Sequence, residues 1–364
     1  MRSVIIGGGV AGCAIAAALR GIPCTRESVM IERRQAHQPA GMGFILMPNG
    51  LDALAQIAPE FDWRAAGRTI DRVSLRAHDG AILTEQAIEP ACCVSREQFL
   101  SMLAQAAGET RTLLGVSLAD LERAEDGSTR AVILDDGSRL EGDAFFACDG
   151  ARSPTRGILF PEAELAPVVV MEIVSIAHSP QLAARLGTTF HKFHDAEGGF
   201  AVGMVAESDS RVVWFVQFDA RRWTLPNAAA STLERFIRER VQGWSDEIAQ
   251  AIEATNFDES HLWPTRDLPP MPEISCENLA LVGDAAHACL PFTSQGANGA
   301  LVDALLLRDL LRDVRTPCEV RRAFAEYSDS RRAHHRRMFI EGRRLRAAFL
   351  APLCQCKPVI PLVA

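Results

Sequence analysis

The sequence predicts an α/β fold with a dinucleotide-binding domain, an inserted β-rich domain and a helical C-terminal segment. Three observations support this prediction. Near the N-terminus a short apolar run, Ser3–Ile6, leads into a glycine-rich turn and then into a stretch rich in Ala, Ile and Leu, an order typical of strand, turn and helix. Residues 165–220 alternate apolar runs with polar turns and show no helical period, which indicates a sheet with one buried face. Beyond Gly299 the pattern is mostly helical.

The N-terminal part of the chain predicts a strand–helix–strand unit followed by a hairpin. Val10–Arg20 has the composition of a buried helix, and Val29–Ile31 is the next apolar strand. Asp71–Ala87 predicts a hairpin that turns at Asp79-Gly80, because Asp-Gly supplies the backbone conformation that tight hairpin turns require. Ser95 then precedes a helix as its N-cap.

The rest of the chain predicts further strands and then helices. Several β segments lie between Leu121 and Phe146, because Asp-Gly turns interrupt the apolar runs there. Ser231–Gly243 predicts a helix, and Ala280–Val282 is the last apolar strand. Two helices, Gly299–Val314 and Cys318–Phe349, complete the fold. These elements divide the chain into a discontinuous first domain (1–70, 92–164 and 273–317), an inserted β-rich domain (71–91 and 165–272) and a helical segment (318–364).

Composition excludes several classes of protein. The 364 residues are 48% hydrophobic and 23% charged, which suits a globular protein of one to three domains. No apolar run is long enough to span a membrane, and the apolar strand follows Met1 too closely for a signal peptide. The net charge of −8 argues against a nucleic-acid channel. Ten cysteines without a C-x-x-C pair indicate reduced thiols and a cytoplasmic protein.

The first motif is G-x-G-x-x-G, which runs from Gly7 to Gly12 between the first strand and the first helix. Gly7 permits the tight turn, and Gly9 lets a pyrophosphate approach the backbone at the helix N-terminus beside Val10 and Ala11. Gly12 allows the helix to pack closely on the strand. Glu32 follows twenty residues after Gly12, where its carboxylate can accept hydrogen bonds from ribose hydroxyls. Together these features predict dinucleotide binding.

Two further motifs follow strands. Asp149-Gly150 comes directly after an apolar strand, and by itself it resembles any strand-to-turn exit. Gly283-Asp284 ends the last strand and precedes the loop Pro291–Asn298 and a helix. A carboxylate there can bind a polyol chain, and the helix dipole can stabilise an anionic ring.

In order and spacing these three motifs resemble those of the class A, single-component FAD-dependent aromatic hydroxylases. The segment Gly41–Gly50 also resembles the Gly-rich, flavin-proximal segment of that family. The resemblance covers nearly the whole chain. It implies a glutathione-reductase-like, Rossmann-like FAD domain, an oxidoreductase that uses NADPH or NADH and O2, and a flavin hydroperoxide that hydroxylates or epoxidises a small aromatic or heteroaromatic substrate.

The resemblance also implies roles for individual residues. Glu32 is expected at the adenosine ribose, Arg33 near the adenine, Arg96 against the cofactor, Asp149 at both FAD and NAD(P)H, and Asp284 at the ribityl chain. The loop Pro291–Asn298 is expected along the flavin ring, although Ser294 stands where many relatives have Gly. The expected cofactor-binding residues are therefore Gly7, Gly9, Val10, Ala11, Gly12, Glu32, Arg33, Arg96, Asp149, Asp284, Pro291, Gln295, Gly296, Ala297 and Asn298.

No catalytic base is evident from the sequence. His191 and His194 lie in the β-rich region, on opposite faces of a regular strand, so at most one can point toward the substrate. Trp214 and Phe218 share one strand face and fit either core packing or substrate contact. The only tyrosine, Tyr327, lies in the C-terminal helical stretch, which removes a tyrosine relay in the pocket.

Metal binding and other reactions are disfavoured. His287 has no His or Cys partners at metal-ligand spacing, so we expect no metal. A flavin-dependent halogenase is excluded because no lysine precedes Lys192 and no W-x-W segment occurs. A flavin-dependent reductase of isoprenoid double bonds and a non-catalytic FAD-fold binding protein stay as alternatives. We expect a monomer or homodimer whose partners are a small-molecule substrate and O2, and the Arg-rich stretch Arg321–Arg346 fits a solvated helix or a docking surface.

Overall fold

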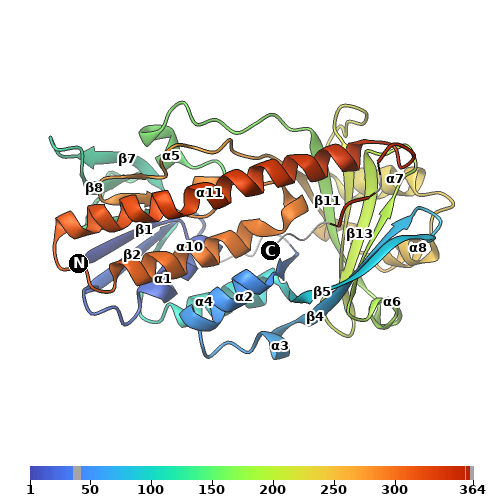
Figure 1. The fold of residues 1–364 in the computed structure, drawn as a ribbon, viewed down its shortest axis with the longest axis horizontal. Helices are drawn as coiled ribbons and strands as arrows, with labels where there is room; N and C mark the ends of the chain where they lie inside the picture. Colours follow the sequence, from blue (N-terminus) through green and yellow to red (C-terminus); the bar gives the residue numbers. More distant parts are fainter. Residues whose placement is uncertain (36–41, 357, 361–364) are drawn as a thin grey trace.

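The computed structural model describes residues 1–35, 42–356 and 358–360. It is an elongated molecule with one sheet near each end of its long axis, and a long helix, α11 (Pro317–Leu350), runs along both (Figure 1). Within the described ranges, no helix combines the length and the apolar composition needed to cross a membrane.

The first sheet forms the core of the dinucleotide-binding domain. Its six strands lie in the order β16-β17-β10-β1-β2-β6, and only the β16–β17 pair is antiparallel. Helix α1 (Val10–Leu19) is almost entirely buried, because its small alanine side chains allow close packing in the domain core. The strands span β1 (Arg2–Ile6), β2 (Glu27–Glu32), β6 (Arg111–Leu114), β10 (Ala144–Ala147), β16 (Ser275–Cys276) and β17 (Leu279–Leu281).

Further helices and a small sheet complete this domain. The antiparallel sheet β7-β8-β9 turns at Gly127 and Gly137, both with positive φ. Its strands are β7 (Leu118–Arg123), β8 (Thr129–Leu134) and β9 (Arg139–Glu141). The helices are α2 (Pro48–Ile57), α3 (Trp63–Ala66), α4 (Arg96–Ala106), α5 (Pro154–Leu159), α9 (Asp284–His287), η2 (Pro291–Thr293) and α10 (Gln295–Leu311).

The second sheet has eight strands in the order β15-β11-β14-β13-β12-β4-β5-β3. They span β3 (Gly43–Leu46), β4 (Arg68–Ala77), β5 (Ile82–Ser95), β11 (Val170–His178), β12 (Thr189–His194), β13 (Phe200–Ala206), β14 (Arg211–Asp219) and β15 (His261–Pro264). Its outer face, which carries Phe193, Trp214 and Phe218, packs under helices at the right-hand end of Figure 1. These are α6 (Pro180–Leu186), α7 (Ala230–Arg240) and α8 (Asp246–Glu253), with η1 (Phe257–Glu259) beside them.

The inner face of the second sheet is directed toward the first domain. Phe190, Val205 and Val213 on this face pack with Met47, at the start of helix α2 of the first domain, and with Ile45 of β3. Since neighbouring residues of a strand point to opposite faces, Lys192 and His194 of β12 share the inner face with Phe190. This face and the start of α2 therefore lie against each other.

Helix α11 connects both cores. Thr316 and Glu319 form a capping box at its start, and Pro317 occupies the first helical position, so the N-terminus is well defined. Near its start the helix packs into the first core, and near its end Leu345 and Phe349 pack with Val170 and Ala201 of the second sheet. After α11 the chain turns back, and Val359 and Ile360 pack beside the inner face.

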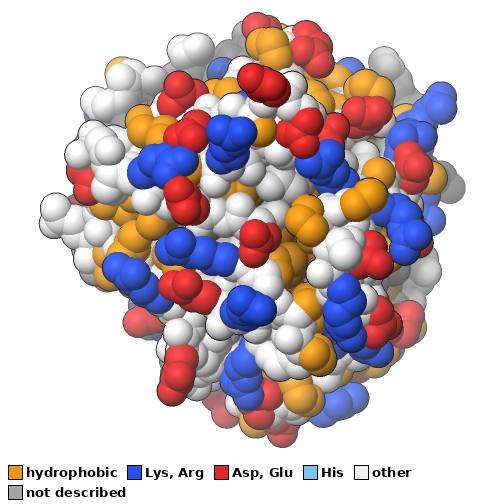
Figure 2. Space-filling view, turned by 90° about the vertical axis from the view of Figure 1, so that its left-hand side faces the viewer, with side chains coloured by type: hydrophobic (Ala, Val, Ile, Leu, Met, Phe, Trp, Pro, Cys, Tyr) orange, Lys and Arg blue, Asp and Glu red, His pale blue; other side chains and the backbone are white. Residues whose placement is uncertain are grey.

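The Arg-rich stretch of α11 does not form a uniform basic surface. Arg321 pairs with Asp126 and Glu277, Arg332 with Asp329, and Arg344 with Glu341. Figure 2 shows basic and acidic side chains intermingled on the left-hand end of the molecule. Such exposed pairs contribute little stability individually, and their mixed charge favours the solvated-helix interpretation.

The structure confirms the predicted fold class and differs in detail. Helix α6 interrupts the region 165–220, where the sequence indicated no helix; Ser179 caps it and Pro180 begins it, a local signal that could have revealed it. β3 and the last residues of β5 pair within the second sheet, although the sequence-based ranges put them in the first domain. Strand pairing crosses that boundary because β5 is one continuous strand of 14 residues.

Trp214→Ala is expected to lower the free energy of unfolding by about 3–5 kcal/mol, because it leaves a large cavity. Trp214 is fully buried, and its Nε1 donates to Thr255 Oγ1 at 2.9 Å. Urea denaturation checks this, with Trp263→Ala as the matched control, since Trp263 is 44% exposed. Unchanged stability with loss of substrate binding would contradict the structural role of Trp214.

Candidate functional site

The glycine fingerprint forms a tight turn that leaves open space at one position. A Cβ on Gly7 (φ +106°) would lie 2.4 Å from the carbonyl oxygen of Cys148, and one on Gly12 would lie 1.9 Å from that of Gly7. At Gly9, the N-cap of α1, an added Cβ would meet no described atom within 4 Å. Unpaired backbone N–H groups at a helix N-terminus attract anions. This opening therefore fits a phosphate group.

Glu32 lies beside the same loop. Its Oε2 accepts from the Gly8 N–H at 2.8 Å and its Oε1 from the Arg34 N–H at 3.0 Å. The carboxylate is thus fixed at the end of β2, as the motif spacing predicted. Arg33 is exposed. The charge of its neighbour Arg34 acts to lower the pKa of Arg96.

The Asp149 motif is connected to the Gly283-Asp284 turn by an arginine that sequence reasoning missed. Asp149 Oδ2 accepts from the Thr155 backbone N–H and hydroxyl. Its other oxygen, Oδ1, is buried and has no hydrogen-bond partner within the described part of the chain. Arg156 is 5% exposed and donates to the carbonyl oxygens of Ala285 at 2.9 Å and Ala151 at 2.6 Å. It thereby bridges two motifs separated by more than a hundred residues.

Asp284 and Arg96 place opposite charges in this region. Burial raises the pKa of Asp284, while the charges of His287, Arg96 and Arg156 act to lower it. Burial and the charge of Arg34 lower the pKa of Arg96, whose guanidinium lies 4.9 Å from the Phe44 ring centroid. Arg96 Nε is buried and has no partner among the residues that the structure describes. Unsatisfied buried polar atoms are costly, so these groups suit the oxygens of a bound polar cofactor.

Behind this turn lies a buried ionic network centred on Asp303. Its Oδ2 accepts from the Gly283 N–H at 2.9 Å and contacts His287 Nε2 at 2.6 Å, and Arg331 Nε donates to Oδ1 at 2.6 Å. Burial acts to raise the pKa of Asp303, but the charges of His287 and Arg331 outweigh it and hold the pKa well below its usual range. The network fixes the turn that carries Asp284. Asp303 follows the Gly283-Asp284 motif in the sequence, but no local signal reveals what Asp303 or Arg331 binds, because their partners are distant in sequence.

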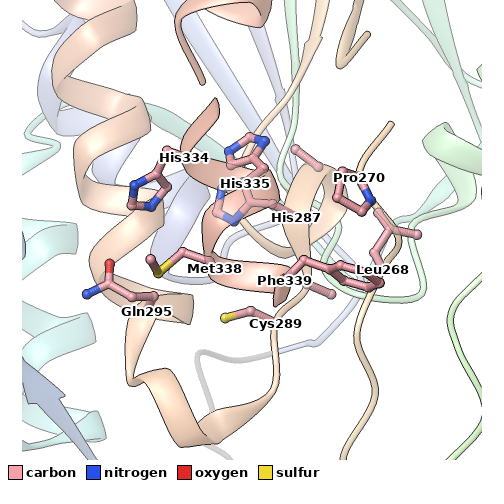
Figure 3. A pocket seen from close by; sticks show the side chains of 11 residues that line it. Leu268, Pro270, His287, Cys289, Gln295, His334, His335, Met338 and Phe339 are labelled. Carbon is pink, nitrogen blue, oxygen red and sulfur yellow. The ribbon is translucent and has the colours of Figure 1, made fainter. Parts of the chain in front are cut away.

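His335 joins His287 in this cluster. The two rings are tilted by 30° with centroids 4.1 Å apart (Figure 3). Possible ligand atoms of His287, Asp303 and His335 all lie within 4.8 Å of one another. Partners for His287 are thus near in space although none has metal-ligand spacing in the sequence. Arg331 already supplies a positive charge to Asp303, which disfavours a cation there. The expectation of no metal stays a prediction.

The loop Pro291–Asn298 is held against residues 45–49, which span the end of β3 and the start of α2. Asn298 Oδ1 accepts from the Met47 N–H at 2.9 Å, and its Nδ2 donates to the carbonyl oxygen of Ile45 at 2.9 Å. Gln295 Oε1 accepts from Asn49 Nδ2 at 3.0 Å. Gly41 of the predicted flavin-proximal segment lies outside the described residues. Gln295 and Asn298 therefore align the N-terminus of α10, and Gly296 of that helix start faces Asp284.

Ser294 adopts the left-handed conformation (φ 55°) immediately before α10. This backbone conformation favours glycine and is strained for other residues. It explains in physical terms why glycine suits this position.

A pocket lies between the inner face of the second sheet, η2 and the end of α11. Its lining includes Lys192, His194, Phe292, Phe349 and Val359. Burial lowers the pKa of His194 to about 3, so its ring is neutral near pH 7. Of the two candidate histidines, only His194 borders this pocket.

The other sequence candidates, His191, Trp214 and Phe218, lie on the outer face, away from this pocket. Trp214 packs against Phe257, and Phe218 against Phe236. His191 is buried on the same side, with the charges of Arg76 and Glu247 near it. The alternation of the strands identified which residues share a face, but helices α6 to α8 cover the face that carries these three.

Asp284→Ala is expected to weaken FAD binding by about ten-fold or more, because hydrogen bonds to a charged group are lost. Equilibrium dialysis of FAD against the apoprotein measures this. Asp258→Ala, at an exposed aspartate of η1, is the matched control. Equal FAD affinity in the two variants would refute the assignment of Asp284.

Ser294→Gly is expected to raise the free energy of unfolding by about 1 kcal/mol, because glycine relieves the strain at φ 55°. Ser294→Ala keeps that strain and is the control. Thermal unfolding of both variants tests this. A higher free energy of unfolding in the alanine variant alone would contradict backbone strain at Ser294.

Comparison with known proteins supports a flavin site. A family model described as an FAD binding domain matches residues 1–341. The FAD-dependent monooxygenase OpS4 of Beauveria bassiana is 25% identical, over 97% of this chain and 86% of its own length. The 3-amino-4-hydroxybenzoate 2-monooxygenase PtmB3 of Streptomyces platensis is 28% identical, over 85% and 79%. The crystal structure of Klebsiella pneumoniae HpxO complexed with FAD and uric acid superposes with a TM-score of 0.85, at 22% identity, over 98% of this chain and 90% of that one.

Proposed function

Because the chain belongs to the FAD-binding-domain family of flavoprotein aromatic hydroxylases, we propose that it uses NAD(P)H and O2 to insert one oxygen atom into a small aromatic or heteroaromatic substrate. The chain is an FAD-dependent monooxygenase, and the proposal concerns its reductant and its class of substrate. The observation that carries it is the convergence of three motifs: Gly7 lies against Cys148 beside Asp149, and Arg156 connects Ala151 with Ala285 beside Asp284.

The residues present fit FAD. The opening at Gly9 suits the pyrophosphate, and Glu32 suits the ribose. Arg96 and Asp149, whose buried polar atoms lack partners among the described residues, suit the polar middle of the cofactor, and Asp284 suits the ribityl hydroxyls. When bound, the flavin supplies the activation of O2.

The protein then has three tasks of its own. The α10 N-terminus, aligned by Gln295 and Asn298, stabilises negative charge at the ring. The apolar side chains of the inner face and Phe292 keep water from the reacting atoms. The pocket orients the substrate carbon that receives oxygen.

Two considerations support a nicotinamide nucleotide as the reductant and an aromatic compound as the substrate. The chain has one G-x-G-x-x-G fingerprint, which suits an enzyme that binds NAD(P)H transiently rather than in a second dinucleotide domain. The matched relatives include a 3-amino-4-hydroxybenzoate monooxygenase and a structure with uric acid. The proposed oxygen insertion is either a hydroxylation or an epoxidation of the substrate.

The test is substrate-dependent oxygen incorporation by the flavin-loaded enzyme. With its substrate from an aromatic and heteroaromatic panel, the protein is expected to oxidise NADH or NADPH, consume O2 and yield a product heavier by one oxygen from ¹⁸O₂. Product formation without O2 uptake would overturn the proposal in favour of a flavin-dependent reductase. Purified protein that neither carries nor binds flavin would favour a non-catalytic binding protein.

A further inference from the structure

The pocket contains a cation that the cofactor-binding motifs do not involve. Lys192 is one of two lysines among 38 basic residues. It lies on β12, on the inner face, and is 4% exposed. Placing an ammonium group in the interior is costly unless it is paired, so its surroundings indicate what it binds.

Three aromatic rings surround the Lys192 ammonium. The ring centroids of Phe292, Phe349 and Phe215 lie 5.1, 5.7 and 6.0 Å from Nζ. Phe215 reaches over the strand at Gly203, where an added Cβ would clash with the ring. Cation–π attraction stabilises the positive charge, but it gives the N–H groups of the ammonium no oxygen acceptor for a hydrogen bond.

The hydrogen bonds of Lys192 leave donor capacity unused. Nζ donates to Gln217 Oε1 at 2.6 Å, and Gln217 Nε2 donates to Glu172 Oε1. An ammonium has three N–H groups, and within the described residues Gln217 is its only hydrogen-bond partner. Glu172 is 8% exposed and balances the charge only across the intervening amide. The hydrogen-bonded row of Lys192, Gln217 and Glu172 therefore holds the ammonium in place, while the carboxyl group of Glu172 does not contact it directly.

The position of this cation relates it to the reaction. Phe292 belongs to η2, directly before Ser294 and the start of α10, the loop assigned above to the flavin ring. His194, which lines the same pocket, has a buried Nε2 without a partner among the described residues. An aromatic ring seated among the phenylalanines would thus meet one cation and one neutral histidine.

We propose that Lys192 anchors the substrate through a carboxylate, so that the substrate class is a small aromatic acid, and that Gln217 and Glu172 are positioning residues for the ammonium. This inference rests on the proposed function, because it identifies the pocket as the substrate site. A carboxylate satisfies the unused donors with charge-assisted hydrogen bonds, whereas a neutral ring leaves them unsatisfied.

The first test compares benzoate with benzamide, which match in size and differ in charge. Their dissociation constants are measured from the flavin absorbance change in the FAD-loaded enzyme. Benzoate is expected to bind at least about ten-fold tighter than benzamide, a typical effect of a charge-assisted hydrogen bond. Lys192→Met is expected to abolish this preference while benzamide affinity changes less than about three-fold, and Lys192→Arg is expected to keep it.

The second test uses the unmodified enzyme and thus does not depend on variant folding. Burial lowers the pKa of Lys192 to about 8, against the opposing influence of Glu172. Benzoate affinity should therefore decline as the pH rises through this range, because the free ammonium loses its proton, while benzamide affinity stays level. The other ionisable groups near the ammonium are Glu172, His194 and Asp195. Burial lowers the pKa of His194 to about 3, so its ring stays neutral through this range. Burial raises the pKa of Glu172, so the same titration of Glu172→Gln separates the two groups: a decline that persists in this variant belongs to Lys192, and its disappearance would overturn the assignment to Lys192.

The outcomes separate the two proposals. Equal affinity for both probes, or no benzoate binding by folded, flavin-loaded enzyme up to about 10 mM, would overturn the role of Lys192. If neutral aromatic compounds alone were oxygenated, the anchor would be refuted while the monooxygenase proposal stood. Selective benzoate binding with no O2-dependent product from any aromatic acid would leave the anchor in place and refute the proposed function.

Discussion

The site depends on one buried carboxylate. Asp303 lies on α10, and its two oxygens bind the Gly283 backbone, His287 and Arg331, so three chain segments converge on a single group. Removing one partner from such a buried ionic group costs several kcal/mol, since the remaining charge is left uncompensated. These contacts of Asp303 tie together the Asp284 turn, α10 and α11. Arg156 reinforces it from the other side by connecting Ala285 with Ala151.

The two faces of the second sheet differ in role, because the outer face forms a core with the helices and the inner face borders the pocket. The outer face carries Trp214 and Phe218 and is covered by helices, which is a mainly apolar arrangement. The inner face carries Lys192, Gln217 and Glu172, a buried polar row that would weaken an ordinary core. A fold that tolerates such a row beside its cofactor loops has retained it at a cost in stability, which is typical of functional sites.

The sequence predicted the parts of this molecule that local chemistry determines. The glycine turn, the Asp-Gly turns and the strand alternation depend on neighbouring residues. The sequence could therefore predict the turn from Gly7 to Gly12, the position of Glu32, and that His191 and His194 lie on opposite faces of their strand. Asp303, Arg331 and Arg156 were not, because each acts on a segment brought near only by folding. Alternation likewise could not tell which face α6 to α8 would cover, and this is why Trp214 and Phe218 were candidates while Lys192 was considered only as evidence against a halogenase.

Helix α11 has a mechanical consequence for the enzyme. Its 34 residues extend over roughly 50 Å at 1.5 Å per residue, and the helix is packed into the first core at Phe324 and against the second sheet at Phe349. A rod embedded at both ends resists bending between them. The helix therefore ties the spacing of the two sheets to its own length.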